Sequence, residues 1–521
     1  MLSTQQIHAI DQLFSEWAKS GSPGCALALM HDGDLLYSRG YGMANLEYHI
    51  PIQPTTIFHI ASISKQFAAA AIALLEQDGL LSADDDVRSY IPELHDFGKT
   101  ITLRHMIHHT SGLRDQWELL VLAGWRMDDV ITTEDILEMA FAQRELNFEP
   151  GAEYMYCNTG YTLLGLIVQR VTGKSLREFC AERIFTPLGM KNTHFHDDYL
   201  ELVPQRAYSY EKHDDGFQHN HLMYSNVGAT SLFTTVEDLV LWGQNYVERT
   251  VGGDDLFEKM VRKGIFNDGH TIDYAFGVLS RVYKGLPVIE HSGGDAGFRT
   301  HLLVFPQQRC SIAVFANLDS INPIKLSNQV ADIFLAEHLE TLENKTIDLP
   351  KDVLQTLEGI YYREESALAV QLVYDEHQGV LCLYDGALEA VDQNTLRRIP
   401  APHIQFTFTS DSIEVLDTIT GLPVRYDRVP VYEPTTAVLD ELVGAYRSPE
   451  LQSQCAISIE NGLLTLRRRK YEPMTFQPLI EDGYINFKYG VTLLFERDSE
   501  QNITSLKWTN GRVRRLHFDR L

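Results

Sequence analysis

One short motif in the sequence has the residue types and spacing of a catalytic nucleophile. Ser62-Ile-Ser-Lys65 directly precedes an alanine-rich apolar stretch that favours a helix. In a helix, a three-residue spacing places Ser62 and Lys65 on one face, one turn apart. The helix N-terminus favours negative charge developing at Ser62, and Lys65 would ease its deprotonation. The same spacing recurs at Ser209-Tyr-Glu-Lys212, where no helical pattern follows, so we expect Ser62 to be the nucleophile.

Two further segments carry residues suited to proton transfer and substrate binding. Tyr156-Cys-Asn158 follows a Pro-Gly turn; a loop tyrosine can act as a general base, and an asparagine can orient a substrate carbonyl or the lysine. His291-Ser-Gly-Gly294 follows an apolar strand, where glycines let a substrate backbone approach and the histidine could contact the proton network. Taken alone, each segment is more typical of packing, capping or a turn.

Together, the three segments resemble the motifs of the serine penicillin-recognising hydrolases: SxxK at a helix start, YxN in a loop, and K/H-x-G on a core strand. That family includes class C β-lactamases, DD-peptidases, related esterases and D-aminopeptidases. The resemblance covers about residues 8–338. Further segments resemble the family at His109-Thr-Ser-Gly-Leu113, Pro150 to Tyr161, Pro187-Leu-Gly-Met190 and Thr234 to Asp238.

The resemblance implies a cofactor-free serine hydrolase that acts through a covalent acyl-enzyme. By position, the catalytic residues would be Ser62 as nucleophile, Lys65 and Tyr156 as proton-transfer pair, and His291. Substrate-binding residues would be Asn158, Gly293 and Gly294, with the amides of Ser62 and Gly294 as oxyanion hole. Because His291 stands where most β-lactamases have lysine, a permanent cation that often meets a substrate carboxylate is missing. Esterase and aminopeptidase activities are therefore favoured over carboxylate-recognising ones.

The layout of the chain resembles the D-stereospecific aminopeptidase branch of this family. In that branch a loop from the last barrel helps to recognise the substrate amine, and the corresponding segment here is about Arg469 to Tyr484, with Glu481 and Asp482 as candidates. The sequence thus predicts release of N-terminal D-amino acids from peptides or amides. A carboxylesterase or acyl transferase of the same fold is the alternative, and a non-catalytic ligand-binding protein is the alternative from another class.

Composition restricts the partners and the compartment. The 521 residues carry 44 basic and 71 acidic side chains, a net charge of −27, which argues against nucleic-acid and anionic-membrane partners. No apolar run approaches the roughly 20 residues of a membrane helix, and the N-terminus lacks the features of an export signal. Six cysteines without a CxxC pair indicate reduced thiols, so we expect a cytoplasmic protein. A homo-oligomer, the substrate side chain and its stereochemistry are left open.

The first 340 residues alternate helical and strand-like patterns that would position these motifs. Two strands around Asp32-Gly33 predict a hairpin, and three more strands are expected over 286–290, 299–305 and 310–317. Helices are expected over about 65–80, 133–142, 159–171 and 175–184, the last with a capping box of Ser175 and Glu178. The resulting fold class is an α/β (α+β) β-lactamase/transpeptidase-like domain in which helices flank a central antiparallel sheet.

After about residue 340 the pattern changes to short alternating strands. Asn344 to Pro350 reads as a linker. Leu357-Glu-Gly-Ile-Tyr361 recurs as Leu442-Val-Gly-Ala-Tyr446, and Gly379 to Leu383 recurs as Gly462 to Leu466. The near-constant offset predicts two consecutive antiparallel β-barrels that hide their own strand edges. The expected domains are 1–340, 341–434 and 435–521.

Three histidine-rich groups and one basic run remain outside these motifs. The histidine groups are His105, His108 and His109; His194 and His196 with Asp197 and Asp198; and His213, His219 and His221. None has HExxH or tight Cys/His spacing, so the sequence favours packing or surface roles and no metal. Arg467 to Lys470 is expected to be a solvated strand end.

Overall fold

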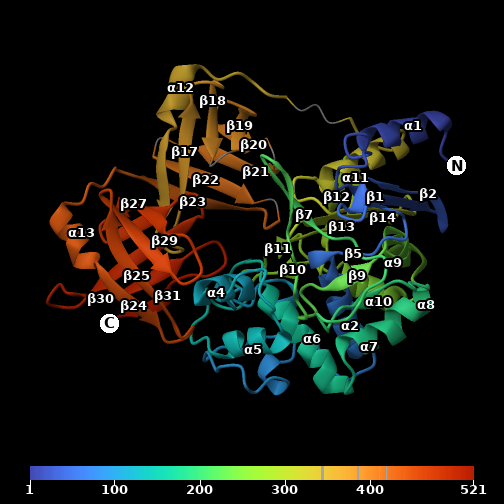
Figure 1. Ribbon diagram of the computed structural model, residues 1–521, viewed down its shortest axis with the longest axis horizontal. Helices are drawn as coiled ribbons and strands as arrows, with labels where there is room; N and C mark the ends of the chain where they lie inside the picture. The colour runs from blue at the N-terminus through green and yellow to red at the C-terminus, as the bar shows by residue number, and fades with distance from the viewer. Residues whose placement is uncertain (342–344, 384–385, 400, 410, 418) are drawn as a thin grey trace. The chain divides into compact units, whose positions relative to one another are not determined.

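The computed structural model describes residues 1–341, 345–383, 386–399, 401–409, 411–417 and 419–521 (Figure 1). The chain forms two compact units. The first comprises Met1–Ser111, Met127–Glu138 and Pro150–Leu342, and the second comprises Gly112–Arg126, Met139–Glu149 and Glu343–Leu521. Two short segments from the first third of the chain therefore group with the barrels, although the sequence placed all of 1–340 in one domain. Asn344, the expected start of the linker, lies outside the described residues.

A six-stranded antiparallel sheet forms the centre of the first unit, in the order β12-β13-β14-β15-β1-β2. Its strands are β1 (Cys25–His31), β2 (Asp34–Tyr41), β12 (Leu279–Tyr283), β13 (Leu286–Asp295), β14 (Phe298–Phe305) and β15 (Cys310–Ala316). The hairpin is confirmed: Asp32 and Gly33 both have positive φ, as a type I′ turn requires. Two features differ from the prediction. Edge strand β12 was missed, and β13 continues through the His291 motif, which the sequence had placed after the strand.

Helices cover both faces of this sheet. On one face α1 (Thr4–Leu13) and α11 (Pro323–Phe334) pack on large apolar side chains such as Leu27 and Phe305. On the other face lies α9 (Val236–Glu248), where the sheet presents small residues. A Cβ at Gly243 of α9 would lie only 2.6 Å from the Cβ of Ser311, so glycine permits this close approach.

Helix α2 (Ser64–Gln77) follows the 3₁₀ turn Ala61–Ile63 that contains Ser62. Every residue of α2 from Ser64 to Leu75 is buried, in keeping with a helix that is apolar on all sides. The other helices that lie wholly in the first unit are α3 (Leu103–Ile107), α6 (Asn158–Thr172), α7 (Leu176–Cys180), α8 (Thr186–Leu188) and α10 (Gly253–Met260). Helix α4 (Gln116–Ala123) belongs to the second unit, and α5 (Thr133–Phe141) begins in the first unit and ends in a segment of the second. The predicted capping box of Ser175 and Glu178 starts α7, but a π-helical turn, Ala181–Phe185, interrupts the continuous helix expected there.

Several short sheets complete the first unit. A three-stranded sheet of β5 (Phe58–His59), β9 (Leu232–Thr234) and β6 (His194–Phe195) leads directly into the turn that contains Ser62. The two-stranded sheets are β3 (Met43–Asn45) with β4 (Ile50–Pro51), β7 (Tyr210–His213) with β8 (Gly216–His219), and β10 (Gly264–Ile265) with β11 (Thr271–Ile272).

The second unit contains two closed eight-stranded antiparallel barrels, as the repeat predicted. The first consists of β16 (Gly359–Arg363), β17 (Leu368–Asp375), β18 (Val380–Leu383), β19 (Gly386–Ala390), β20 (Thr395–Arg398), β21 (Ala401–Phe408), β22 (Ser412–Asp417) and β23 (Leu422–Val429). The second consists of β24 (Gly444–Ser448), β25 (Ser453–Glu460), β26 (Leu463–Arg468), β27 (Met474–Ile480), β28 (Gly483–Asn486), β29 (Val491–Arg497), β30 (Ile503–Thr509) and β31 (Leu516–Arg520).

The repeat has a structural counterpart at the start of each barrel. A short helix, α12 (Lys351–Thr356) or α13 (Thr436–Leu442), precedes the first strand. The hydroxyl of Tyr361 donates to the carbonyl of Leu357 at 2.9 Å, and that of Tyr446 donates to Leu442 at 2.8 Å. An equivalent tyrosine thus ties the helix to the strand in each barrel, which gives the recurrence of this motif a structural reason.

All six cysteines are free thiols, and five of them are buried. Burial raises the pKa of the Cys310 thiol to about 12, which keeps it protonated and unreactive. Within the described residues, no helix combines the length and the apolar character needed to cross a bilayer. The cytoplasmic location stays a prediction.

We expect Tyr361→Phe and Tyr446→Phe each to destabilise the chain by about 1 kcal/mol, because each removes one hydrogen bond and leaves its carbonyl without the donor. The loss should be larger for Tyr446, whose hydrogen bond is buried, than for Tyr361, whose bond is half-buried. Urea unfolding followed by far-ultraviolet circular dichroism measures both. Equal stability of wild type and Tyr446→Phe would contradict the role assigned to this hydroxyl.

Candidate active site

The buried ammonium of Lys65 joins the motifs of the site. Its Nζ lies 3.1 Å from Ser62 Oγ, which confirms that the three-residue spacing puts both side chains on one face. Nζ also donates to Asn158 Oδ1 and to the carbonyl of Ala229, each at 2.8 Å. Three acceptors thus surround a fully buried ammonium, and a buried charge is tolerated only with such hydrogen bonds.

Tyr156 lies against the same ammonium. Nζ of Lys65 is 4.8 Å from the centre of the Tyr156 ring, and the ring packs on His109 at a centroid distance of 4.2 Å. His109 Nδ1 accepts the backbone N–H of Cys157 at 3.0 Å and so positions the loop between Tyr156 and Asn158. This hydrogen bond gives a structural role to His109, the first residue of the segment His109–Leu113. In the sequence, that segment was noted only because it resembles the family.

The backbone turn that leads into Ser62 is strained. Ala61 has a φ of +50°, a left-handed conformation that costs a residue with a side chain about 1–3 kcal/mol. Hydrogen bonds on both sides hold it: its N–H donates to His59 Nδ1 at 3.2 Å, and its carbonyl accepts the hydroxyl of Ser64 at 2.5 Å. Ser64 in turn accepts the N–H of Leu232 from β9 at 3.0 Å. The surrounding sheet therefore maintains the geometry of Ser62.

A hydrogen-bonded relay continues from this turn to β13. Because His59 Nδ1 accepts from Ala61, the proton lies on Nε2, which faces Thr230 Oγ1 at 3.2 Å. Thr230 donates to Asp295 Oδ2 at 2.8 Å. Burial lowers the pKa of His59 to about 3, with help from Arg206 and His196, so the imidazole is neutral. The relay connects the two backbone segments that flank the nucleophile.

His291 is neutral as well. Its pKa is lowered to about 3, first by burial and then by the positive charge of Lys65. Nδ1 faces the carbonyl of Ser292 at 2.6 Å and must donate to it, which leaves Nε2 to accept the hydroxyl of Tyr274 at 3.0 Å. Tyr274 was not predicted. At this position the site therefore offers a hydrogen-bonded neutral imidazole and no positive charge.

The two glycines of β13 have different surroundings. A Cβ at Gly293 would lie 2.3 Å from both the carbonyl oxygen of Ile60 and Thr300 Oγ1, so β13 presses directly on the turn that contains Ser62. Gly294 is exposed, and a Cβ there would meet only Arg299, at 3.7 Å. Gly293 thus provides close packing. The oxyanion-hole role of the Gly294 amide remains a prediction, which the close contact between β13 and the turn that contains Ser62 supports.

Glu481 and Asp482 belong to the second unit, in the turn between β27 and β28. Both carboxylate oxygens of Asp482 accept from Arg497, at 2.7 and 2.9 Å, whereas Glu481 is exposed. Of the two, Glu481 is the better candidate to meet a substrate ammonium. Its role in substrate recognition stays a prediction.

Sequence reasoning missed four residues that shape the site: His59, Tyr274, Thr230 and Asp295. His59 stands three residues before Ser62, and Asp295 follows Gly294 directly. Their closeness to the motifs in the sequence is a signal by which both could have been found. Thr230 and Tyr274 gave no comparable signal. Only the folding of the chain brings them to the motifs.

The comparisons with known proteins agree with this geometry. A family model described as Beta-lactamase matches residues 10–334, which is more than half of the chain. The chain belongs to the beta-lactamase family. It is also a serine hydrolase of that family, as the three motifs predicted.

Individual relatives extend over more of the chain. It is 27% identical to a D-aminopeptidase of Gluconobacter oxydans (strain 621H) over 459 residues, which cover 86% of this chain and 84% of that protein. It is 28% identical to penicillin-binding protein 4* of Bacillus subtilis (strain 168) over 421 residues, 74% of this chain and 88% of that protein. The structure of the octameric penicillin-binding protein homologue from Pyrococcus abyssi resembles it with a TM-score of 0.57 and 23% identity, covering 91% of this chain and 100% of that one.

In this beta-lactamase family member, Gly293→Ala should be far more disruptive than Gly294→Ala. The added methyl group at 293 must displace the backbone before Ser62, and overpacking of this kind costs about 1–3 kcal/mol. We expect a lower melting temperature and a loss of activity for Gly293→Ala. Gly294→Ala serves as the matched control for stability and should melt like wild type. Equal melting temperatures for the two variants would contradict the packing described here.

Asp295 should give the protein a pH-dependent stability. Burial raises its carboxyl pKa from 3.8 to about 6, so the folded chain holds this proton more tightly than the unfolded chain. Stability should therefore fall as the pH rises between these two values. Asp295→Asn keeps an acceptor for Thr230 but cannot titrate. Relative to wild type, it should gain on the order of 2 kcal/mol at about pH 7 compared with about pH 4. Thermal unfolding across this range measures the effect, and parallel curves would refute it.

Proposed function

We propose that this protein is a D-stereospecific aminopeptidase or amidase that releases an N-terminal D-amino acid from a peptide or amide. The observation that carries the proposal is the similarity to a D-aminopeptidase over 86% of the chain, which reaches beyond residues 10–334 into the barrels. The match therefore extends past the hydrolase region into the barrels. The homo-oligomer left open by the sequence is supported by the octameric relative and stays a prediction.

The geometry of the site supports an acyl-enzyme mechanism. Ser62 Oγ attacks the substrate carbonyl carbon while its proton passes to the Lys65–Tyr156 pair, which accepts it when the coupled pair carries one proton fewer than an ammonium and a phenol together. The backbone amides of Ser62 and Gly294 stabilise the oxyanion. The pair returns the proton to the departing amine as the C–N bond breaks, which leaves an ester on Ser62. A water molecule then adds to this ester by the same route, and the free acid and Ser62 are regenerated.

The lack of charge at His291 disfavours a carboxylate substrate at this position. A substrate carboxylate buried beside a neutral imidazole would lack a countercharge at this position, and an unpaired buried charge is strongly unfavourable. A carboxylate substrate would therefore gain little from this side of the site. Beta-lactam hydrolysis and carboxypeptidase activity are disfavoured for the same reason.

A carboxylesterase or acyl transferase is the second candidate. The same serine, lysine and tyrosine would form an acyl-enzyme from an ester, and penicillin-binding protein 4* shows that relatives of similar identity carry other names. A non-catalytic ligand-binding protein is the third candidate. The Lys65–Ser62 hydrogen bond weighs against it, because a scaffold would have no need to bury an ammonium next to a serine hydroxyl.

Ser62→Ala should lower kcat by several orders of magnitude, up to about 10⁶-fold, because the covalent nucleophile is lost. Ser209→Ala removes the serine of the second SxxK match and should leave kcat unchanged. Tyr156→Phe keeps the ring but removes the hydroxyl, so kcat should fall by about 10²-fold or more at an unchanged melting temperature. More than a tenth of wild-type activity in Ser62→Ala would show that the nucleophile lies elsewhere.

A stereochemically paired panel of substrates tests the proposed function. We expect kcat/KM for D-alanine p-nitroanilide to exceed that for the L-isomer and for the N-acetylated D-isomer by at least about tenfold each, since every 1.4 kcal/mol of discrimination is tenfold. Preference for p-nitrophenyl esters irrespective of configuration would support the esterase instead. Failure of a fluorophosphonate probe to add mass to a Ser62 peptide would support the binding protein.

A further inference from the structure

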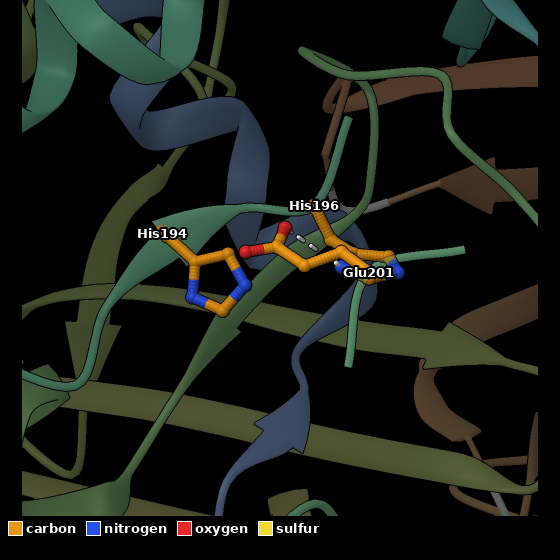
Figure 2. A group of neighbouring side chains, drawn as sticks. All are labelled: His194, His196 and Glu201. Atoms are coloured by element: carbon orange, nitrogen blue, oxygen red, sulfur yellow. Dashed lines mark ion pairs between the residues drawn. The ribbon is translucent and has the colours of Figure 1, made fainter. Parts of the chain in front are cut away.

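A group of two histidines and one glutamate lies on the small sheet β5-β9-β6, apart from the catalytic side chains. His194 and His196 are two residues apart along an extended segment, so both side chains project to the same side, and Phe195 between them is fully buried. Glu201 follows after a turn. Figure 2 shows the carboxylate between the two rings, and one ligand atom of each residue lies within 4.8 Å of the other two.

Two ring nitrogens of this group are buried without a hydrogen bond in the part of the chain that the structure describes: Nε2 of His194 and Nδ1 of His196. The side chain of His196 is almost entirely buried, and its Nδ1 is 3.7 Å from Glu201 Oε2, beyond hydrogen-bond distance. Buried polar atoms in folded proteins are nearly always paired. Two such nitrogens beside one carboxylate therefore indicate that a further group binds among these three side chains.

We propose that His194, His196 and Glu201 bind one divalent metal ion of the zinc class. Imidazole nitrogen and carboxylate oxygen are ligands of Zn²⁺ at about 2.0–2.2 Å, and ligand atoms around a tetrahedral ion are about 3.3 Å apart. The separation of 3.7 Å between His196 Nδ1 and Glu201 Oε2 is close to that value. The Glu201 side chain is one-third exposed and can close the remaining gap. A water molecule would complete the coordination.

Charged side chains next to the group would influence its affinity for the ion. Arg177 already donates to both oxygens of Glu201, at 2.6 and 2.8 Å, so the ion and the guanidinium would share this carboxylate. Glu201 and Arg206 also line a surface groove of about 610 Å³, so the carboxylate side of the group borders this groove.

The position of the group implies a structural role for the ion. The N–H of His196 donates to the carbonyl of Ser231 at 2.8 Å, and β6 pairs with β9, which pairs with β5. The ring of Phe233 contacts both cluster histidines on one side and His59 on the other. A bound ion would therefore stabilise the sheet that leads into the turn that contains Ser62. The Phe233 side chain lies between the two cluster histidines and His59 in this chain of contacts. The sequence favoured packing here because it does not show that Glu201 turns back to the histidines.

The experiment uses the untagged full-length chain, freed of metal by a chelator and then titrated with Zn²⁺ in a calorimeter and with Co²⁺ by visible absorption. We expect one ion per chain, a cobalt spectrum typical of four-coordinate nitrogen and oxygen ligands, and a higher melting temperature with Zn²⁺. His194→Gln, His196→Gln and Glu201→Gln should each weaken binding by at least tenfold and abolish the thermal shift.

The matched control is His213→Gln, which changes an exposed histidine that also lies beside a glutamate, Glu211, at 2.9 Å. This variant should bind like wild type. Glu201→Gln alters a partly exposed side chain, and its circular dichroism in chelator shows whether it folds. No stoichiometric binding by wild type, or equal binding by wild type and Glu201→Gln, would overturn the proposal. Both readouts are independent of the hydrolase activity and of its substrate.

Discussion

The buried ammonium of Lys65 is the constraint on which the arrangement of the hydrolase unit depends. A charge in that position requires acceptors from three directions, and they come from Ser62, from Asn158 and from the carbonyl of Ala229. These groups lie on three segments that are far apart in the sequence. Placing them around one cation brings the nucleophile, the tyrosine loop and the segment before β9 into a single site. The same charge helps to keep His291 neutral.

The nucleophile turn shows how strain is balanced in this fold. Ala61 is held in a left-handed conformation by partners that include a histidine, a serine hydroxyl and, through Thr230, a carboxylate on β13. His59 is neutral because burial lowers its pKa to about 3, so it carries no proton to pass along the relay at neutral pH beyond the one on Nε2. The relay is therefore better understood as support for the backbone than as a second proton path.

Much of this could be predicted from the sequence, and the rest could not for identifiable reasons. The SxxK spacing and the hairpin depend on neighbours within a few residues, and the two barrels are visible as motifs that recur at a near-constant offset; all three are confirmed. The roles of Thr230 and Tyr274 depend on contacts across long stretches of chain, which local patterns do not reveal. Strand β13 was expected to end before His291 because Ser-Gly-Gly is typical of a turn, yet pairing with β14 keeps it extended. The grouping of 112–126 and 139–149 with the barrels was also unpredictable, since it depends on tertiary contacts alone.

Helix α2 has a consequence for how the enzyme loses and keeps activity. Because every side chain from Ser64 to Leu75 is buried, this helix has no exposed face from which it could fray or detach on its own. Local opening reactions, the kind that amide hydrogen exchange detects, are driven by segments with few buried contacts. Lys65 should therefore belong to the slowest-exchanging part of the unit, so it is released only with global unfolding of the unit. Motion during substrate entry and product release is then expected from more exposed segments, while Lys65 itself stays rigid.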